Sequence, residues 1–104
     1  MKLCLGGAQF GLDYGVTNFS GKVSVHNLAA ILDIAASSGI RALDTAPVYG
    51  DSELRIGEMS NMRFDVYTKT SGLISCEKKV GDMARQSLSA SLGRLKVDRI
   101  EGLL

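Results

Sequence analysis

The chain has 104 residues, of which 45% are hydrophobic and 22% charged, as in an ordinary globular domain and unlike a disordered segment. Its 12 lysine and arginine residues nearly balance 11 aspartate and glutamate residues without any block of like charge, which argues against binding to nucleic acid or to an anionic membrane. Because its longest apolar runs fall far short of the about 20 residues that span a bilayer and no signal peptide is recognisable, we expect a cytoplasmic protein whose partner is a small molecule or another protein.

The first half of the chain predicts a strand, a loop and a helix. Residues 2–6 form an apolar run typical of a strand, and residues 7–22 predict a long loop because they are rich in glycine and follow neither a strand nor a helix period. A helix follows, with Ser24 as its N-cap and Gly39 at its C-terminal end. Its apolar face contains Leu28, Ile31, Leu32 and Ala35.

The second half repeats this alternation. Residues 40–43 predict a second strand, and Asp51 is the expected N-cap of a short helix that begins at about Ser52. Residues 64–69 and 99–104 predict two further strands. Between them the sequence has the clearest helical period of the chain, with one face formed by Val80, Met83, Ala84, Ser87, Leu88, Ser91, Leu92 and Leu95.

Alternating strands and helices predict an α/β fold with parallel strands, either an open doubly wound sheet or part of a (β/α)8 barrel. The first loop contains Gly6, Gly7 and Gly11, whose spacing does not fit the G-x-G-x-x-G pattern of dinucleotide-binding sheets, and no G-K-[ST] phosphate loop occurs. The barrel is therefore favoured. In both architectures, active sites lie at the carboxyl ends of the strands, so the residues that directly follow each strand are the candidates for a site.

Three ionisable residues follow neighbouring strands, namely Asp44, Tyr49 and Lys69. A phenol is a poor acid at neutral pH, but a nearby ammonium stabilises the phenolate, and a carboxylate keeps that ammonium charged. Together they could make Tyr49 a general acid for a carbonyl oxygen that receives hydride. Each residue also has an ordinary structural explanation, because an aspartate after a strand often caps a turn, a tyrosine can simply pack, and a lysine usually extends to water.

The segment "LDTAPVYGDSE..IG" resembles the aldo-keto reductase signature, in which a tyrosine follows an aspartate by five positions and precedes a short helix. The segments "LGGAQFGLDYGVTN", "YTK" and "QSLSASLGRLKVDRIEGLL" are similar to family segments in the same order. The first is most similar to bacterial members associated with surface-sugar biosynthesis. The resemblance implies an NADPH-dependent oxidoreductase that reduces aldehydes or ketones on a TIM barrel.

The resemblance also implies roles for individual residues. Tyr49 matches the catalytic acid, Lys69 the lysine that strengthens it, and Asp44 the carboxylate paired with that lysine. The cofactor NADP(H) is implied to lie against Gly7, Ala8, Gln9 and Asp44, although many members have threonine in place of Ala8.

Two features of the family are not found in these 104 residues. The catalytic histidine of the fourth strand is one, because the only histidine, His26, lies in the first turn of the first long helix, where we expect it to be solvated and without a catalytic role. The phosphate-binding loops are the other, since a whole barrel takes about 250 residues and places them after its last two strands. We therefore expect residues 1–104 to form a single partial domain, the N-terminal half of a barrel with about three and a half βα units.

Three hypotheses follow. The leading one is an aldo-keto reductase segment that is inactive, or nearly so, on its own and acts on a small-molecule carbonyl substrate. The second is a non-catalytic half barrel that associates with itself or with a separate C-terminal half. The third and weakest is a half-barrel phosphate binder, with "GGAQFG" as a faint candidate cradle. The cysteines, Cys4 and Cys76, have no metal-ligand spacing, so we expect reduced thiols and no metal site.

Overall fold

A computed structural model describes residues 2–61, 63–72 and 79–104. Four parallel strands form one sheet in the order β1-β2-β3-β4, with bounds β1 Cys4–Gly6, β2 Ala42–Asp44, β3 Asp65–Thr68 and β4 Gly102–Leu103. In this described part of the chain, four helices lie between the strands, with α1 and α2 both between β1 and β2; their bounds are α1 Ala8–Gly11, α2 Val25–Ser37, α3 Ser52–Met59 and α4 Val80–Leu95. This arrangement confirms the α/β fold with parallel strands. None of the described helices is long and apolar enough to cross a bilayer.

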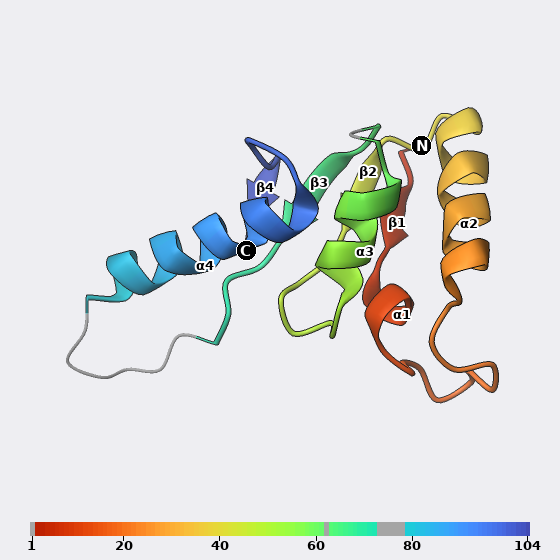
Figure 1. The fold of residues 1–104 in the computed structure, drawn as a ribbon, viewed down its shortest axis with the longest axis horizontal. Helices are drawn as coiled ribbons and strands as arrows, with labels where there is room; N and C mark the ends of the chain where they lie inside the picture. Colours follow the sequence, from red (N-terminus) through yellow and green to blue (C-terminus); the bar gives the residue numbers. More distant parts are fainter. Residues whose placement is uncertain (1, 62, 73–78) are drawn as a thin grey trace.

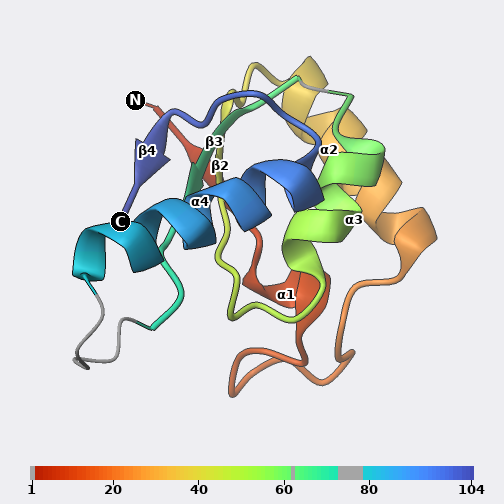
Figure 2. The same ribbon diagram turned by 60° about the vertical axis from the view of Figure 1, so that its left-hand side comes forward.

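The helices α2, α3 and α4 lie on one face of the sheet (Figures 1 and 2). Strand residues that point to this face, such as Leu43 and Val66, are buried against helix residues such as Leu32, Ile56 and Leu95. The opposite face carries Cys4, Asp44 and Tyr67, which are exposed or half-buried. The structure therefore has two layers, with the hydrophobic core between the sheet and its helices.

Most of the predicted elements are present, with shorter strands than expected. The Ser24 hydroxyl caps α2 by accepting a hydrogen bond from the backbone N–H of Asn27 at 3.2 Å, and Gly39 follows the helix with φ +79°. The predicted face of α4 is buried or half-buried except at Val80, which is 51% exposed. His26 is exposed in the first turn of α2, as expected.

One prediction was wrong, because the segment expected to be a loop over residues 7–22 begins with the four-residue helix α1. Local sequence period gives no sign of this turn, which exists because Phe10 is buried in the core at 3% exposure. A backbone hydrogen bond from Leu12 N–H to the Ala8 carbonyl closes it at 3.1 Å. Tertiary burial therefore overrides the weak helical propensity of a glycine-rich segment.

Asp51 stands at the N-cap position of α3, but its carboxylate makes no capping hydrogen bond and instead pairs with Lys22 and Arg55. Cys4 is an exposed free thiol. Cys76 lies outside the described residues, so its expected state stays a prediction, as does the single partial domain over residues 1–104.

Candidate active site

The parallel register brings the carboxyl ends of the strands to one edge of the sheet. Gly6, Asp44 and Tyr67 are paired across β1, β2 and β3, so the residues that follow them emerge side by side. Asp44 is the last residue of β2, and Lys69 follows β3 directly. The sequence predicted Asp44 just beyond the second strand, and the structure includes it in that strand.

Lys69 and Asp44 form a close ion pair. The Lys69 Nζ donates to Asp44 Oδ1 at 2.8 Å and to Oδ2 at 3.0 Å, and also to the backbone carbonyl of Thr45 at 3.0 Å. Both side chains are about one-third exposed, at 31% for Lys69 and 35% for Asp44. The ammonium therefore has three oxygen acceptors at the edge of the sheet.

The pKa of Lys69 is raised above its usual value by the balance of two opposing effects. Burial acts to lower the pKa, but the hydrogen bond and charge of Asp44 outweigh it, and Tyr49 adds a smaller effect in the same direction as Asp44. The side chain is therefore held as an ammonium at neutral pH.

Tyr49 reaches the same edge through a tight turn. Its backbone N–H donates to the Ala46 carbonyl at 3.1 Å, and Gly50, which follows it, has φ +57°. The Lys69 Nζ lies 5.2 Å from the centroid of the Tyr49 ring. The structure thus brings together all three residues predicted as the acid–base group, and their catalytic roles stay predictions.

The loop that follows β1 forms one wall of a cavity at this edge. The cavity has a volume of about 270 Å³, and its lining residues are Gly6, Gly7, Ala8, Gln9, Tyr14, Asp44 and Tyr49. Gly7 is held by a hydrogen bond from its backbone N–H to the Asp44 carbonyl at 2.7 Å, and a Cβ atom there would lie 2.8 Å from that oxygen. Every residue predicted to contact the cofactor therefore lines the same cavity as Tyr49.

These residues fit one end of a nicotinamide cofactor better than the other. Asp44 is the only charged residue among the described residues of the cavity wall, so nothing in this wall would balance the charge of phosphate groups. The Gln9 side chain donates its amide to the Tyr14 carbonyl at 2.9 Å, which holds the wall in place. The wall suits an uncharged ring beside Tyr49. A larger cavity of about 440 Å³ lies at the opposite, amino ends of the strands and contains none of the three residues.

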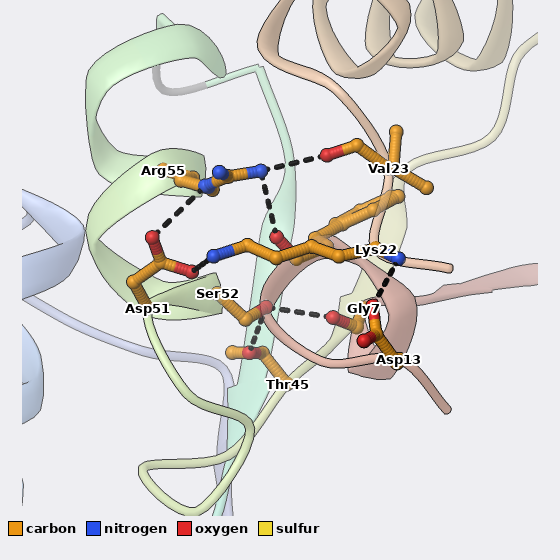
Figure 3. Close-up of polar contacts among 9 residues, drawn as sticks. Gly7, Asp13, Lys22, Val23, Thr45, Asp51, Ser52 and Arg55 are labelled. Atoms are coloured by element: carbon orange, nitrogen blue, oxygen red, sulfur yellow. Dashed lines mark hydrogen bonds and ion pairs between the residues drawn. The ribbon is translucent and has the colours of Figure 1, made fainter. Parts of the chain in front are cut away.

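Behind the cavity, a polar network fastens the first loop to α3 (Figure 3). The Ser52 hydroxyl donates to the Gly7 carbonyl at 2.7 Å and lies 3.0 Å from the Thr45 hydroxyl, and all three residues are buried. Arg55 donates to the Val23 and Phe10 carbonyls at 2.7 and 3.2 Å. The wall of the cavity is thus supported by side chains of α3.

Sequence reasoning did not identify Tyr14, Glu53 or Arg55. Tyr14 could have been suspected as an aromatic residue in a loop that follows a strand. The spacing of Arg55 from Asp51 indicates a helical ion pair, but no sequence pattern reveals that its other acceptors are backbone carbonyls. Among the described residues, no group of three or more histidine, cysteine, aspartate or glutamate side chains could hold a metal ion.

Parallel βα units with ionisable side chains gathered at the carboxyl ends of the strands define the class of protein, which is part of a (β/α)8 barrel. The model of the aldo/keto reductase family matches residues 2–104, and the chain belongs to that family.

Solved structures agree with this assignment. A crystal structure of a protein from Pseudomonas aeruginosa that is assigned as an aldo-keto reductase is 35% identical, with a TM-score of 0.78 over 96% of this chain. A second structure from that organism with the same assignment is 31% identical, with a TM-score of 0.75, and also covers 96% of this chain. The chain spans 40% and 39% of the length of these two proteins. No curated protein matches the chain.

Proposed function

We propose that this chain supplies the acid–base site of an NADPH-dependent reductase that converts a small aldehyde or ketone into an alcohol. The observation that carries the proposal is the Lys69–Asp44 ion pair beside the ring of Tyr49, at a cavity walled by Gly7 and its neighbours. Membership of the aldo/keto reductase family supports the same chemistry at a coarser level.

The proton step belongs to Tyr49. When bound, the cofactor supplies a hydride to the carbonyl carbon, and the Tyr49 hydroxyl gives its proton to the carbonyl oxygen, so the substrate gains one hydride and one proton. The phenolate left behind is stabilised by the Lys69 ammonium, which Asp44 keeps charged. Solvent then returns a proton to Tyr49.

The residues that would hold the reactive end of the cofactor are Gly7, Ala8, Gln9 and Asp44. A side chain at Gly7 would clash with the Asp44 carbonyl, so glycine lets this loop pack closely against β2 and α3, and the backbone of the loop is fixed by hydrogen bonds to Asp44 and Ser52. A preorganised wall of this kind limits the orientations that a bound ring can adopt relative to Tyr49.

We further propose that the 104 residues alone turn over slowly or not at all, because they correspond to about 40% of the neighbouring structures. We propose that the chain works together with a C-terminal half barrel and that it is located in the cytoplasm. The first loop, "LGGAQFGLDYGVTN", supports a place near the bacterial members associated with surface-sugar biosynthesis.

A second candidate function is a non-catalytic half barrel that associates with itself. It is favoured by the strands β1 and β4, each of which pairs on one side only, and by the sheet face with Cys4 and Tyr67, which no described helix covers. Unpaired edges and open faces promote association. Size-exclusion chromatography with light scattering tests this candidate function by measuring the oligomeric state. A chain that is monomeric at high concentration contradicts self-association.

The reductase proposal is tested by consumption of NADPH with a simple aldehyde such as 4-nitrobenzaldehyde. The chain is assayed alone and after it replaces the corresponding N-terminal part of the Pseudomonas aeruginosa neighbour. We expect little turnover by the chain alone and turnover by the chimera that is lost in Tyr49→Phe. A chimera that is folded but inactive while the intact neighbour is active, or one whose rate is unchanged in Tyr49→Phe, contradicts the proposal.

A further inference from the structure

A buried carboxylate, that of Glu53, lies behind the candidate site and takes no part in the proton step. Glu53 is 1% exposed, between α3, α4 and the end of β3. Its Oε1 accepts a hydrogen bond from the Thr68 hydroxyl at 2.6 Å, and its Oε2 accepts one from Arg94 Nε at 2.7 Å. A charge removed from water in this way is costly unless both oxygens are paired, and here both are.

One end of this contact leads to Tyr49. Glu53 lies in the first turn of α3, and the backbone N–H of Ser52 donates to the Tyr49 carbonyl at 3.1 Å. This hydrogen bond joins the turn that carries Tyr49 to the start of α3, so displacement of the first turn of α3 would also displace Tyr49.

The other end leads to Lys69. Thr68 is fully buried and immediately precedes Lys69, so its hydroxyl points to the helix side of the sheet while the lysine emerges on the site side. A hydrogen bond that fixes Thr68 therefore fixes the backbone from which the Lys69 side chain departs.

We propose that Glu53 is a positioning residue that holds Lys69 against Asp44 and Tyr49 from behind the sheet, through the hydroxyl of Thr68. The inference rests on the proposed function of Tyr49 and Lys69 for its importance in catalysis. The hydrogen bond between Glu53 and Thr68 joins α3, the helix that follows Tyr49, to the residue immediately before Lys69. The Arg94 contact has a separate purpose, because it fastens α4 to α3.

The two contacts of Glu53 allow positioning to be separated from general stability. Thr68→Val keeps the shape of the side chain but has a methyl group in place of the hydroxyl that donates to Glu53, while Thr68→Ser keeps the hydroxyl. Glu53→Gln weakens both contacts. Glu58→Gln is the matched control, since Glu58 lies on the same helix and is exposed.

The test measures how fast the ammonium hydrogens of Lys69 exchange with water in the 104-residue chain, by proton–nitrogen NMR at constant pH, with Lys69→Arg to assign the signal. We expect exchange in Thr68→Val and Glu53→Gln to be roughly fivefold faster than in the unaltered chain, the factor that corresponds to one net hydrogen bond. Exchange in Thr68→Ser and Glu58→Gln is expected to stay at the original rate. Lys22, which is also half-buried in an ion pair, reports any general loosening.

Unchanged exchange in Thr68→Val overturns the inference, as does an equal loss of protection at Lys69 and Lys22. If Glu53→Gln fails to fold, the two Thr68 variants still decide the question. The measurement needs no turnover, so the positioning role and the reductase proposal, which the aldehyde assay tests, can each fail alone.

Discussion

Gly11 lies so close to Tyr49 that a Cβ atom at position 11 would overlap the carbonyl oxygen of Tyr49. The same holds from the other side, because a Cβ atom at Gly50, the residue after Tyr49, would overlap the carbonyl oxygen of Gly11. The backbone of the first loop therefore packs directly on the turn that carries the candidate acid.

Gly11→Ala is expected to force these two segments apart and to lower the free energy of unfolding by about 1–3 kcal/mol, as overpacking usually does. Urea denaturation measures this loss, and the ring signals of Tyr49 report the displacement. The control is Gly93→Ala in α4, where no described atom outside the helix's own backbone lies within 4 Å of the added carbon and where alanine should stabilise the helix. A Gly11→Ala chain as stable as the original, with unmoved Tyr49 signals, contradicts the packing argument.

Tyr49→Phe removes only the hydroxyl that the proposed proton step requires. In a chimera that consumes NADPH with an aldehyde, we expect kcat to fall by about 10²- to 10⁴-fold, the usual contribution of a general acid, with cofactor binding unchanged. Tyr67→Phe is the matched control, because Tyr67 lies on the same face of the sheet but packs over Gly102 instead of lining the cavity. An equal fall in kcat in the two variants would contradict the role of Tyr49 as the general acid.

The sequence was sufficient to predict the order of the strands and long helices, because the strands are short apolar runs and the long helices have a helical hydrophobic period. It also predicted that Asp44, Tyr49 and Lys69 would meet, since parallel strands place their carboxyl ends at one edge of the sheet. The ion pair at 2.8 Å confirms this meeting of Asp44 and Lys69.

The support of the site was beyond such reasoning. The short helix α1 depends on burial of Phe10, and the acceptors of Arg55 are backbone carbonyls, which have no signature in a sequence. Glu53 lies in the first turn of α3, but its partners, Thr68 and Arg94, come from segments that only the fold brings together. Long-range contacts of this kind are fixed by packing and not by local period.

Arg94→Gln is expected to cost more stability than an ordinary surface ion pair would suggest. It leaves the carboxylate of Glu53 buried with one partner fewer, and a broken buried pair typically costs about 3–5 kcal/mol. Because the Arg94 side chain is 38% exposed, we expect the lower end, about 3 kcal/mol, in urea denaturation. Arg85→Gln breaks an exposed pair with Asp82 in the same helix and should cost less than about 1 kcal/mol. Similar losses in both variants would contradict this ranking.

The ion pairs of Asp51 predict a loss of stability in acid. The hydrogen bond from Lys22 lowers the pKa of Asp51 below its usual 3.8, and with the help of Arg55 it outweighs the opposing effect of burial. Since the folded pKa is depressed, the contribution to stability is complete above pH 3.8 and is lost as the pH falls through the lowered value. The side chain is 41% exposed, so the effect is screened and small.

The measurement is the midpoint of urea unfolding between about pH 5 and pH 2 for the original chain and for Asp51→Asn. We expect the asparagine variant to lose less stability over this range. Asp33→Asn, which removes the carboxylate of an exposed ion pair with Arg63, controls for the loss of one acidic group. Parallel curves for the original chain and Asp51→Asn would rule out the linkage.

Arg55 holds the glycine-rich first loop in a defined conformation, which the sequence of the loop alone does not explain. Its guanidinium, in a side chain that is 18% exposed, binds the Asp51 carboxylate at 3.1 Å and the carbonyls of Phe10 and Val23, which lie at the two ends of the loop. A lysine at this position carries the same charge but has a compact ammonium that cannot span all three acceptors. We therefore expect Arg55→Lys to lower the free energy of unfolding by about 1–3 kcal/mol, with one or two partly buried carbonyls left unpaired.

Hydrogen exchange separates this local effect from a global one. Amides of residues 8–23 should exchange faster in Arg55→Lys, whereas those of α4 should change only as far as global stability requires. Arg99→Lys, at an exposed position, is the control for the substitution itself. Unchanged exchange over residues 8–23 would mean that the loop is held by its own Asn18 and Asp13 hydrogen bonds, so that the cavity wall beside Tyr49 owes its order to the loop and not to α3.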